Sequence, residues 1–192
     1  GDAADHYLLF FSDDGLSWSE GEVVQGTSSE RTVTSYRTQY VRVAAVNDGG
    51  ASFPSNTLAF SRSPDDQPPI LIIDAFDRLQ SSTLYAEEVP TLGTVKRMNL
   101  RMINSYQSAV PHASAVDTLG WGFDSASDEV LSNIDLSAYD IVIWIAGEES
   151  TVDESISSSA QVQLEDFWRS GGKLFVSGAE ILWDLDYRGD TQ

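Results

Sequence analysis

Acidic side chains follow three apolar, strand-like segments of this sequence. They are Asp74 and Asp77 after the first segment, Glu148 and Glu149 after the second, and Glu180 after the third. Ligands of open parallel sheets bind beyond the carboxyl ends of the strands, so neighbouring strands would bring these carboxylates to one crevice. Converging carboxylates repel one another and need a cation, a shared proton or water between them.

Two chemistries use such a cluster. Hard oxygen ligands suit Ca²⁺ or Mg²⁺, the only cofactors that the sequence suggests, and the expected ligands are Asp74, Asp77, Glu148 and Glu149. A carboxylate pair with one raised pKa could instead hydrolyse a glycan by acid–base catalysis, with Asp77, Glu148, Glu149 and Glu180 as candidates. The plainer alternative is that these residues occupy solvated loops and cap helices.

Ser177 and His112 are the remaining catalytic candidates. Ser177 stands where a strand passes into the next segment, the position of a nucleophile elbow. A serine nucleophile needs a nearby base, and His112 could reach it only through folding. A structural Ser-Gly turn and a hydrogen-bonded histidine are the interpretations that we favour. The chain has no cysteine, which excludes disulfides, Cys-ligated zinc and cysteine nucleophiles.

Arg97 and Arg101 lie four residues apart in a segment, Lys96–Ala109, whose apolar spacing predicts a helix. They could clamp an acidic sugar or a carboxylate, or neutralise nearby acids such as Asp124. Tryptophan side chains could stack on sugar rings or pack in the core. The predicted ligand-binding residues are therefore Arg97, Arg101, Asp124 and Trp183.

The charge of the chain limits its partners. Its 192 residues include 30 acidic and 11 basic side chains, for a formal net charge of -19. Such a surface repels phosphate backbones and anionic membranes, so no nucleic-acid partner is expected. The longest apolar runs, Ile70–Ile73 and Ile141–Ala146, are far too short to span a bilayer, so no membrane insertion is expected.

Residues 1–63 have the pattern of a β-sandwich. Tyr7–Phe11, Gln39–Asn47 and Thr57–Phe60 are strand-forming segments, and the second alternates between two faces. Turn signals recur roughly every ten residues, which is typical of sandwiches. Residues 64–69 are rich in proline and polar side chains, and predict a linker.

Residues 70–192 have an α/β pattern. Ile70–Asp74 and Ile141–Ile145 are continuous apolar strands of the kind buried on both faces of a parallel sheet. Ser159–Ser170 predicts a helix that Gly171 and Gly172 end, and Lys173–Ser177 is a third strand. Strand, helix and strand in succession predict a βαβ unit.

Two stretches carry a family resemblance in the first part. Residues 40–56 resemble the last two strands of a bacterial fibronectin type III domain, and Tyr7–Trp18 is similar to an earlier strand pair of that fold. The resemblance implies the C-terminal part of such a sandwich, because roughly its first two strands have no room before Tyr7.

The second part resembles the class I glutamine amidotransferase-like α/β domain that accompanies fibronectin type III modules in secreted bacterial proteins labelled xanthan lyase-like or N-acetylmuramoyl-L-alanine amidase-like. The matching segments are Ile72–Arg78, His112–Ala113, Phe123–Ser127, Gly147–Thr151, Asp153–Glu154 and Gly171–Leu185. The resemblance implies the N-terminal part of a doubly wound, flavodoxin-like parallel sheet. Glutamine amidotransferase chemistry is not expected, because the elbow cysteine is absent.

The expected protein is thus a module of a larger secreted bacterial protein, located outside the cell or on its surface. Its sandwich would act as a spacer, and its α/β part would bind an extracellular glycan, a cation or another domain of the same polypeptide without catalysis. A carbohydrate or peptidoglycan hydrolase, and a surface adhesin or structural component, are the alternatives.

Overall fold

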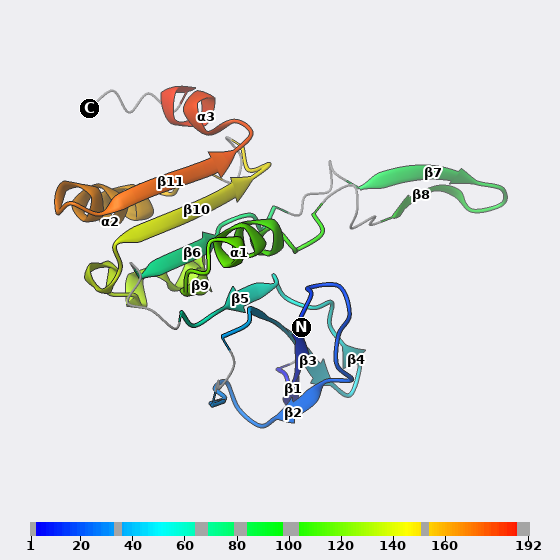
Figure 1. The fold of residues 1–192 in the computed structure, drawn as a ribbon. Helices are drawn as coiled ribbons and strands as arrows, with labels where there is room; N and C mark the ends of the chain where they lie inside the picture. Colours follow the sequence, from blue (N-terminus) through cyan, green and yellow to red (C-terminus); the bar gives the residue numbers. More distant parts are fainter. Residues whose placement is uncertain are drawn as a thin grey trace.

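The computed structural model describes residues 3–32, 36–63, 69–78, 84–97, 104–150 and 154–187. In these residues an antiparallel sheet precedes a parallel sheet in the chain, and a two-stranded hairpin stands apart from both (Figure 1). The fold class is therefore mixed, with antiparallel sheets and a parallel sheet, as the sequence predicts at that level. The predicted linker at 64–69 lies almost wholly outside the described residues.

The first sheet is antiparallel and has the strand order β2-β1-β3-β4, with β5 also paired to β3. Its strands are β1 His6–Ser12, β2 Glu22–Val24, β3 Gln39–Asn47, β4 Gly50–Ala51 and β5 Leu58–Phe60. The alternation predicted in β3 is present, because Tyr40 and Ala44 are buried on one face. This buried face turns toward the second sheet.

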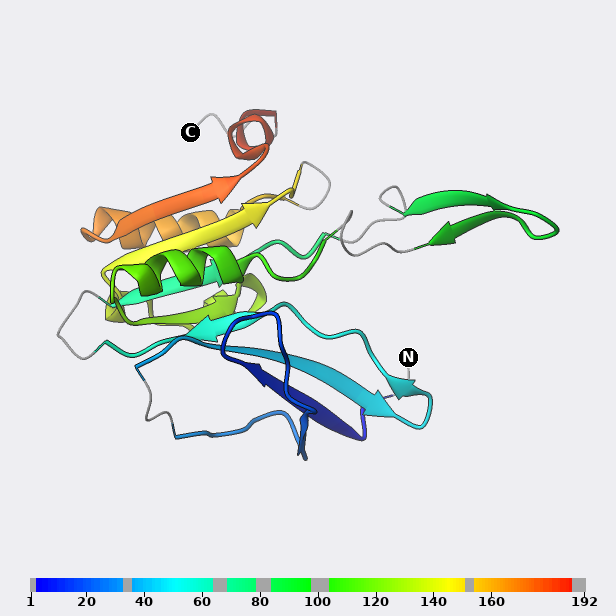
Figure 2. The same cartoon turned by 45° about the vertical axis from the view of Figure 1, so that its right-hand side comes forward.

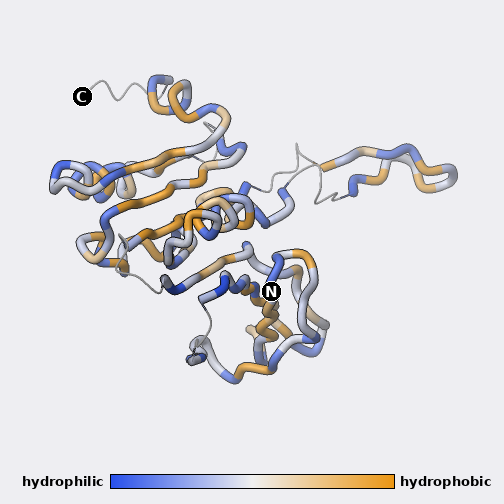
Figure 3. Tube along the Cα trace, in the orientation of Figure 1, coloured by the Kyte–Doolittle hydropathy of each residue, from blue (hydrophilic) through white to orange (hydrophobic). Residues whose placement is uncertain are grey.

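The second sheet is parallel and has the order β11-β10-β6-β9. Its strands are β6 Ile70–Asp74, β9 Phe123–Ser127, β10 Ile141–Gly147 and β11 Lys173–Gly178. Every residue of β6 is buried, as expected for a central strand covered on both faces. Figure 3 shows the hydrophobic character of the central strands along the backbone trace.

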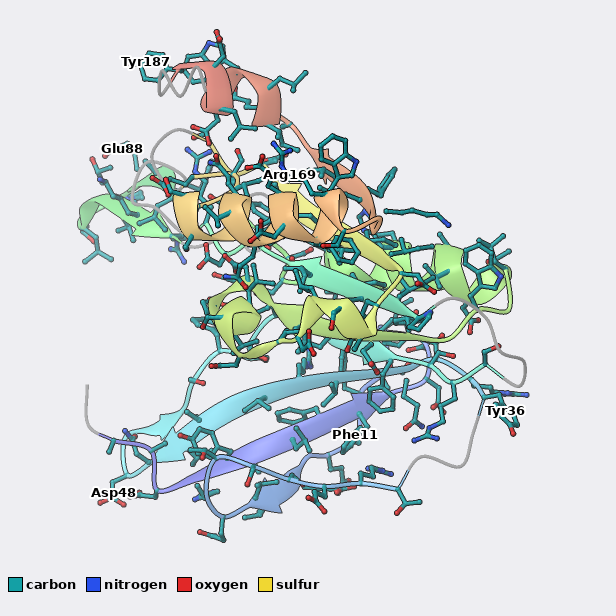
Figure 4. All side chains as sticks on the ribbon, turned by 90° about the vertical axis from the view of Figure 1, so that its left-hand side faces the viewer. Phe11, Tyr36, Asp48, Glu88, Arg169 and Tyr187 are labelled. Carbon is teal, nitrogen blue, oxygen red and sulfur yellow. The ribbon has the colours of Figure 1, made fainter. Side chains whose placement is uncertain are left out.

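Helices cover both faces of the parallel sheet (Figure 2). α1 (Ala109–Thr118) packs on one face, and α2 (Ser158–Arg169) packs on the other with the 3₁₀ segments η2 (Asp128–Asn133) and η3 (Leu136–Ala138). α2 starts where Ser157 accepts a hydrogen bond from the backbone N–H of Ala160, and Arg169 on its outer surface pairs with Glu165 (Figure 4). α3 (Ile181–Tyr187) follows β11.

The hairpin of β7 (Tyr85–Val89) and β8 (Gly93–Arg97) projects away from both sheets (Figures 1 and 2), and carries Glu88 (Figure 4). The predicted helix over Lys96–Ala109 is wrong in its described part. Lys96 and Arg97 pair across the hairpin, residues 104–107 are not helical, and the helix begins only at Ala109. The hairpin pairing holds residues 93–97 in an extended conformation, so no helix can begin at Lys96. Residues 98–103 lie outside the described part.

The two main sheets share a hydrophobic cluster. Tyr40 and Ala59 from the first sheet pack with Ile70, Ala109 and Phe123 from the second part of the chain. Backbone bonds of 2.9 Å run in both directions between Ser61 and Phe123, and join the sheet edges. The antiparallel sheet is therefore packed firmly against the parallel sheet through a common core.

Gly122 marks the closest approach of these two parts. A Cβ atom at this position would lie 2.6 Å from the backbone nitrogen of Ser63 and 3.1 Å from the carbonyl oxygen of Ser61. Only glycine leaves room for two backbones at this separation.

In the described part of the chain, no helix is long and apolar enough to cross a bilayer.

Candidate functional site

The strand order of the parallel sheet places its natural ligand crevice between β6 and β10. The order of the strands changes direction there: β9 lies on one side of β6, whereas β10 and β11 lie on its other side. Ligands of open α/β sheets bind beyond the carboxyl ends at such a point. The loops after the two strands, Asp74–Asp77 and Gly147–Glu149, meet at this edge.

The carboxylate of Glu149 fills this crevice. Its side chain is only 2% exposed, and Oε1 accepts hydrogen bonds from the backbone N–H groups of Asp77 at 3.1 Å and Arg78 at 2.6 Å. Gly147 makes the turn possible, with φ of 53° and a Cβ position that would lie 2.4 Å from the ring of Phe76. Backbone donors that could bind an anionic ligand are thus engaged by the protein itself.

A cleft of about 360 Å³ lies beside this crevice, between the loop that precedes β5 and the ends of β6 and β9. It combines one exposed aromatic ring, a tyrosine, two carboxylates and several small polar groups. Its lining residues are Phe53, Pro54, Ser55, Asn56, Leu58, Asp77, Tyr106, Ser127 and Glu129. Both main parts of the chain contribute, so the cleft exists only because the two sheets pack together.

Buried hydrogen bonds hold the tyrosine of the cleft in place. Tyr106 has φ of 54°, a strained conformation for a bulky side chain. Its backbone N–H donates to Oδ1 of Asn104 at 2.7 Å, and its carbonyl accepts from the backbone N–H of Thr57 at 2.8 Å. Asn104, 2% exposed, also donates from Nδ2 to the carbonyl of Phe76 at 2.8 Å. The strain is maintained by contacts from three segments, as in many preorganised sites.

Acidic side chains gather at the cleft: Asp77 and Glu129 line it, and Asp74 and Asp128 interact electrostatically with both. Burial raises the pKa of Asp74 to about 7, with smaller contributions from Asp128, Glu129 and Asp77, and the backbone N–H of Phe76 partly offsets them. Oδ2 of Asp74 has no hydrogen-bond partner among the described residues, which suits a protonated carboxyl group. Burial, and then repulsion from Glu129 and Asp77, raises the pKa of Asp128 to about 6. This field favours neutral or cationic ligands and disfavours anions.

The predicted metal ligands are not gathered into a metal site. Across the ranges that the structure describes, no group of three or more histidine and acidic side chains could hold a metal ion. Asp74 is buried and does not line the cleft, Asp77 lines it, Glu149 is engaged by backbone N–H groups, and Glu148 is exposed.

The other predicted binding residues lie at separate places. Arg97 is on the hairpin, where it pairs with Glu87 at 2.9 Å, and Arg101 lies outside the described residues. Asp124 accepts a hydrogen bond from the hydroxyl of Tyr139 at 3.0 Å. Trp183 stacks on Tyr187, with ring centroids 4.9 Å apart, and it shares a separate hollow beside α3 with Glu180.

Folding does bring Ser177 and His112 together. Nε2 of His112 lies 3.0 Å from Oγ of Ser177, and Nδ1 lies 2.9 Å from the carbonyl oxygen of Ser108. Both side chains are partly exposed. Both residues were candidates from the sequence, but no sequence pattern predicted their contact, which joins α1 to β11 across 65 positions.

Sequence reasoning did not single out Phe53, Asn104 or Tyr106. Phe53 lies within the segment that resembles fibronectin type III strands, and Tyr106 lies within the expected helix Lys96–Ala109. An exposed aromatic residue next to a proline in a loop was the one available signal.

The geometry defines a mixed α/β protein with a ligand-sized acidic cleft between its antiparallel and parallel sheets. Comparison with protein families, with curated proteins and with solved structures gives no match for this chain.

Proposed function

We propose that this protein is a module of a larger secreted protein, and that the cleft between its two sheets binds a neutral or amino-bearing saccharide without catalysis. The main support for this proposal is the preorganised aromatic and acidic cleft, in which Tyr106 is fixed in a strained backbone conformation beside Asp77. The protein would act outside the cell or on its surface, next to other domains of the same polypeptide.

The composition of the cleft suits a sugar. Phe53 is 67% exposed and offers an apolar ring on which the C–H face of a pyranose can stack. Asp77 and Glu129 accept hydrogen bonds from hydroxyl or ammonium groups, and Asn56 can both donate and accept. The pattern of apolar surface with a few convergent polar groups is typical of small-molecule sites.

The cleft also favours one class of sugar over another. Its carboxylates would repel an acidic sugar, and Arg97, the predicted clamp for such a sugar, pairs instead with Glu87 on the hairpin. An amino sugar would gain an attraction from the acidic field that a neutral sugar lacks.

We also propose finer assignments for the two sheets. Numbered in chain order, the parallel strands are arranged 2-1-3-4, which supports a partial flavodoxin-like, amidotransferase-like sheet. The β1–β3–β5 arrangement and the residue pattern of β3 support a partial fibronectin type III-like sandwich.

Isothermal titration with oligosaccharides tests the function. The probes are chitosan hexamer, cellohexaose and hexagalacturonic acid, which are cationic, neutral and anionic. We expect binding in that order, with no heat from the anionic probe. Phe53→Ala should weaken binding of the first probe about tenfold, since burial of an aromatic face contributes on the order of 1.5 kcal/mol.

Tyr36→Ala provides the matched control, because Tyr36 is an exposed aromatic residue outside the cleft (Figure 4). It should bind as the wild type does. Equal binding by the Phe53→Ala and wild-type proteins, or strongest binding of the anionic probe, would contradict the proposal.

A further inference from the structure

The contact between His112 and Ser177 has the geometry of a base and a nucleophile. Ser177 lies near the carboxyl end of β11, and His112 lies in the first turn of α1, so each is held by regular secondary structure. The distance of 3.0 Å between Nε2 and Oγ is within the range required for proton transfer.

The carbonyl oxygen of Ser108 determines which imidazole nitrogen carries the proton. A carbonyl can only accept, so Nδ1 of His112 must be the donor in their 2.9 Å contact. In a neutral imidazole Nε2 then carries the lone pair, and the hydroxyl of Ser177 donates to it. This is the tautomer that a general base needs, with a backbone carbonyl as the orienting group.

The backbone next to Ser177 offers a donor for a developing oxyanion. The N–H groups of Lys173 and Ala179 donate to the carbonyls of Asp140, the residue before β10, and of Gly147, the last residue of β10. Because N–H groups alternate sides along a strand, the N–H of Gly178 faces the opposite edge of β11. Among the described strands β11 pairs only with β10, so none of them takes up the N–H groups along this edge.

An apolar surface for an acyl or aryl group lies beside the serine. Phe175 is two residues before Ser177 on the same face of β11, and it is 56% exposed. Its neighbour in β10, Ile143, is partly buried on that face. A short hydrophobic group could rest on these side chains while its carbonyl carbon meets Oγ.

We propose that Ser177 and His112 form a second, catalytic site that hydrolyses short-chain carboxylic esters. This activity is independent of saccharide binding in the cleft, because the residues that line the cleft do not include either member of the pair.

The reaction has two balanced steps. Oγ of Ser177 bonds to the ester carbonyl carbon as its proton passes to Nε2 of His112; the carbon–oxygen bond to the alcohol then breaks, and the alcohol leaves with that proton. Water next loses a proton to Nε2, and the resulting hydroxide attacks the acyl-serine. The bond to Oγ breaks, Ser177 regains the proton, and a carboxylic acid is released.

Covalent labelling of the full chain is the first test. A biotinylated fluorophosphonate should form a phosphonyl adduct on Ser177 with loss of fluoride, detected by peptide mass spectrometry, and p-nitrophenyl acetate should be hydrolysed. Ser177→Ala should abolish both signals, and His112→Gln should slow both by about a hundredfold. Tyr36→Ala should behave as the wild type. Circular dichroism of each variant checks its fold.

A second test measures the effect of His112 on the nucleophile without turnover. The chain has no cysteine, so Ser177→Cys introduces its sole thiol. Alkylation by iodoacetamide at neutral pH should be at least about tenfold faster for this variant than for Ser114→Cys, an exposed position on α1, and His112→Gln should remove the difference. Equal alkylation rates, or a phosphonate adduct that persists in Ser177→Ala, would overturn the proposal.

Discussion

Oε1 of Glu149 accepts a hydrogen bond from the backbone N–H of Arg78 at 2.6 Å. This bond ties the loop after β6 to the loop after β10. The same oxygen accepts from Asp77, so one buried carboxylate satisfies two donors at the point where sheet ligands usually bind. The loop that carries Asp77 into the cleft therefore depends on a residue that does not itself line the cleft.

Glu149→Ala should reduce the free energy of unfolding by about 2–4 kcal/mol, because it leaves two backbone donors without their acceptor. Urea denaturation followed by tryptophan fluorescence measures this loss. Glu148→Ala is the matched control, since that neighbour is exposed, and its effect should stay within about 0.5 kcal/mol. Similar losses for both variants would contradict the structural role of Glu149.

Gly122→Ala should separate the two sheets slightly. The new methyl group would meet the backbone of Ser63, which cannot rotate away as a side chain could. We expect a loss of about 1–3 kcal/mol, typical of overpacking, in thermal unfolding. In the control, Gly49→Ala, the methyl group meets only the side-chain oxygen of Asn47, and a much smaller loss is expected. A stable Gly122→Ala protein would argue against this close approach.

Asn104→Ala should affect both stability and binding. It removes the donor to Phe76 and the acceptor for Tyr106, and should cost about 2 kcal/mol of stability. Without that acceptor Tyr106 can relax from φ of 54°, so affinity for the chitosan hexamer should fall as well. Asn133→Ala, at an exposed position, is the control. Retention of full affinity in Asn104→Ala would show that the strained conformation is not needed.

Asp74 should make the protein less stable as the pH rises. Its pKa is about 7 in the folded protein, above the ordinary aspartate value of 3.8, so the folded state holds the proton more tightly. The penalty is absent below about pH 4, grows as the pH rises, and is complete above about pH 7, where it reaches on the order of 4 kcal/mol. Asp128, with a pKa of about 6, adds a penalty of the same sign that is complete at a lower pH.

Asp74→Asn tests this dependence, because it keeps an oxygen for the N–H of Phe76 and removes the titrating group. Its unfolding free energy should exceed that of the wild type at pH 8 and should decline less between pH 5 and pH 8. Asp48→Asn, in an exposed turn, should leave the slope in place. A wild-type protein that gains stability toward pH 8 would contradict the buried, protonated Asp74.

The sequence predicted those elements whose own residues determine them. Ile70–Asp74 and Gln39–Asn47 are strands β6 and β3 with the predicted bounds, and α2 is shifted by one residue from its prediction. In each case a long apolar run or an amphipathic period in the sequence is compatible with few secondary structures other than the one observed. The β7–β8 hairpin was missed because its residues are mostly exposed, so no apolar alternation marks them. β9 has small and polar residues, and only its pairing with β6 makes it a strand.

The candidate site was harder to predict because it is assembled from distant segments. Phe53, Tyr106 and Glu129 meet only after the antiparallel sheet packs on the parallel one, and no local pattern encodes that packing. Acidic residues at the strand ends were visible in the sequence, but burial separates their roles. Asp74 lies beneath the surface, Asp77 faces the cleft and Glu149 holds a loop.

The shared cluster of Tyr40, Ala59, Ile70, Ala109 and Phe123 has a consequence for how this protein could be recombined. A cut within residues 64–69 would follow the boundary that the sequence suggests, yet it would leave apolar side chains of both pieces exposed to water. Neither piece could be moved to a new host polypeptide without a substitute for the other. Shuffling between genes would therefore have to transfer the two sheets as a single cassette.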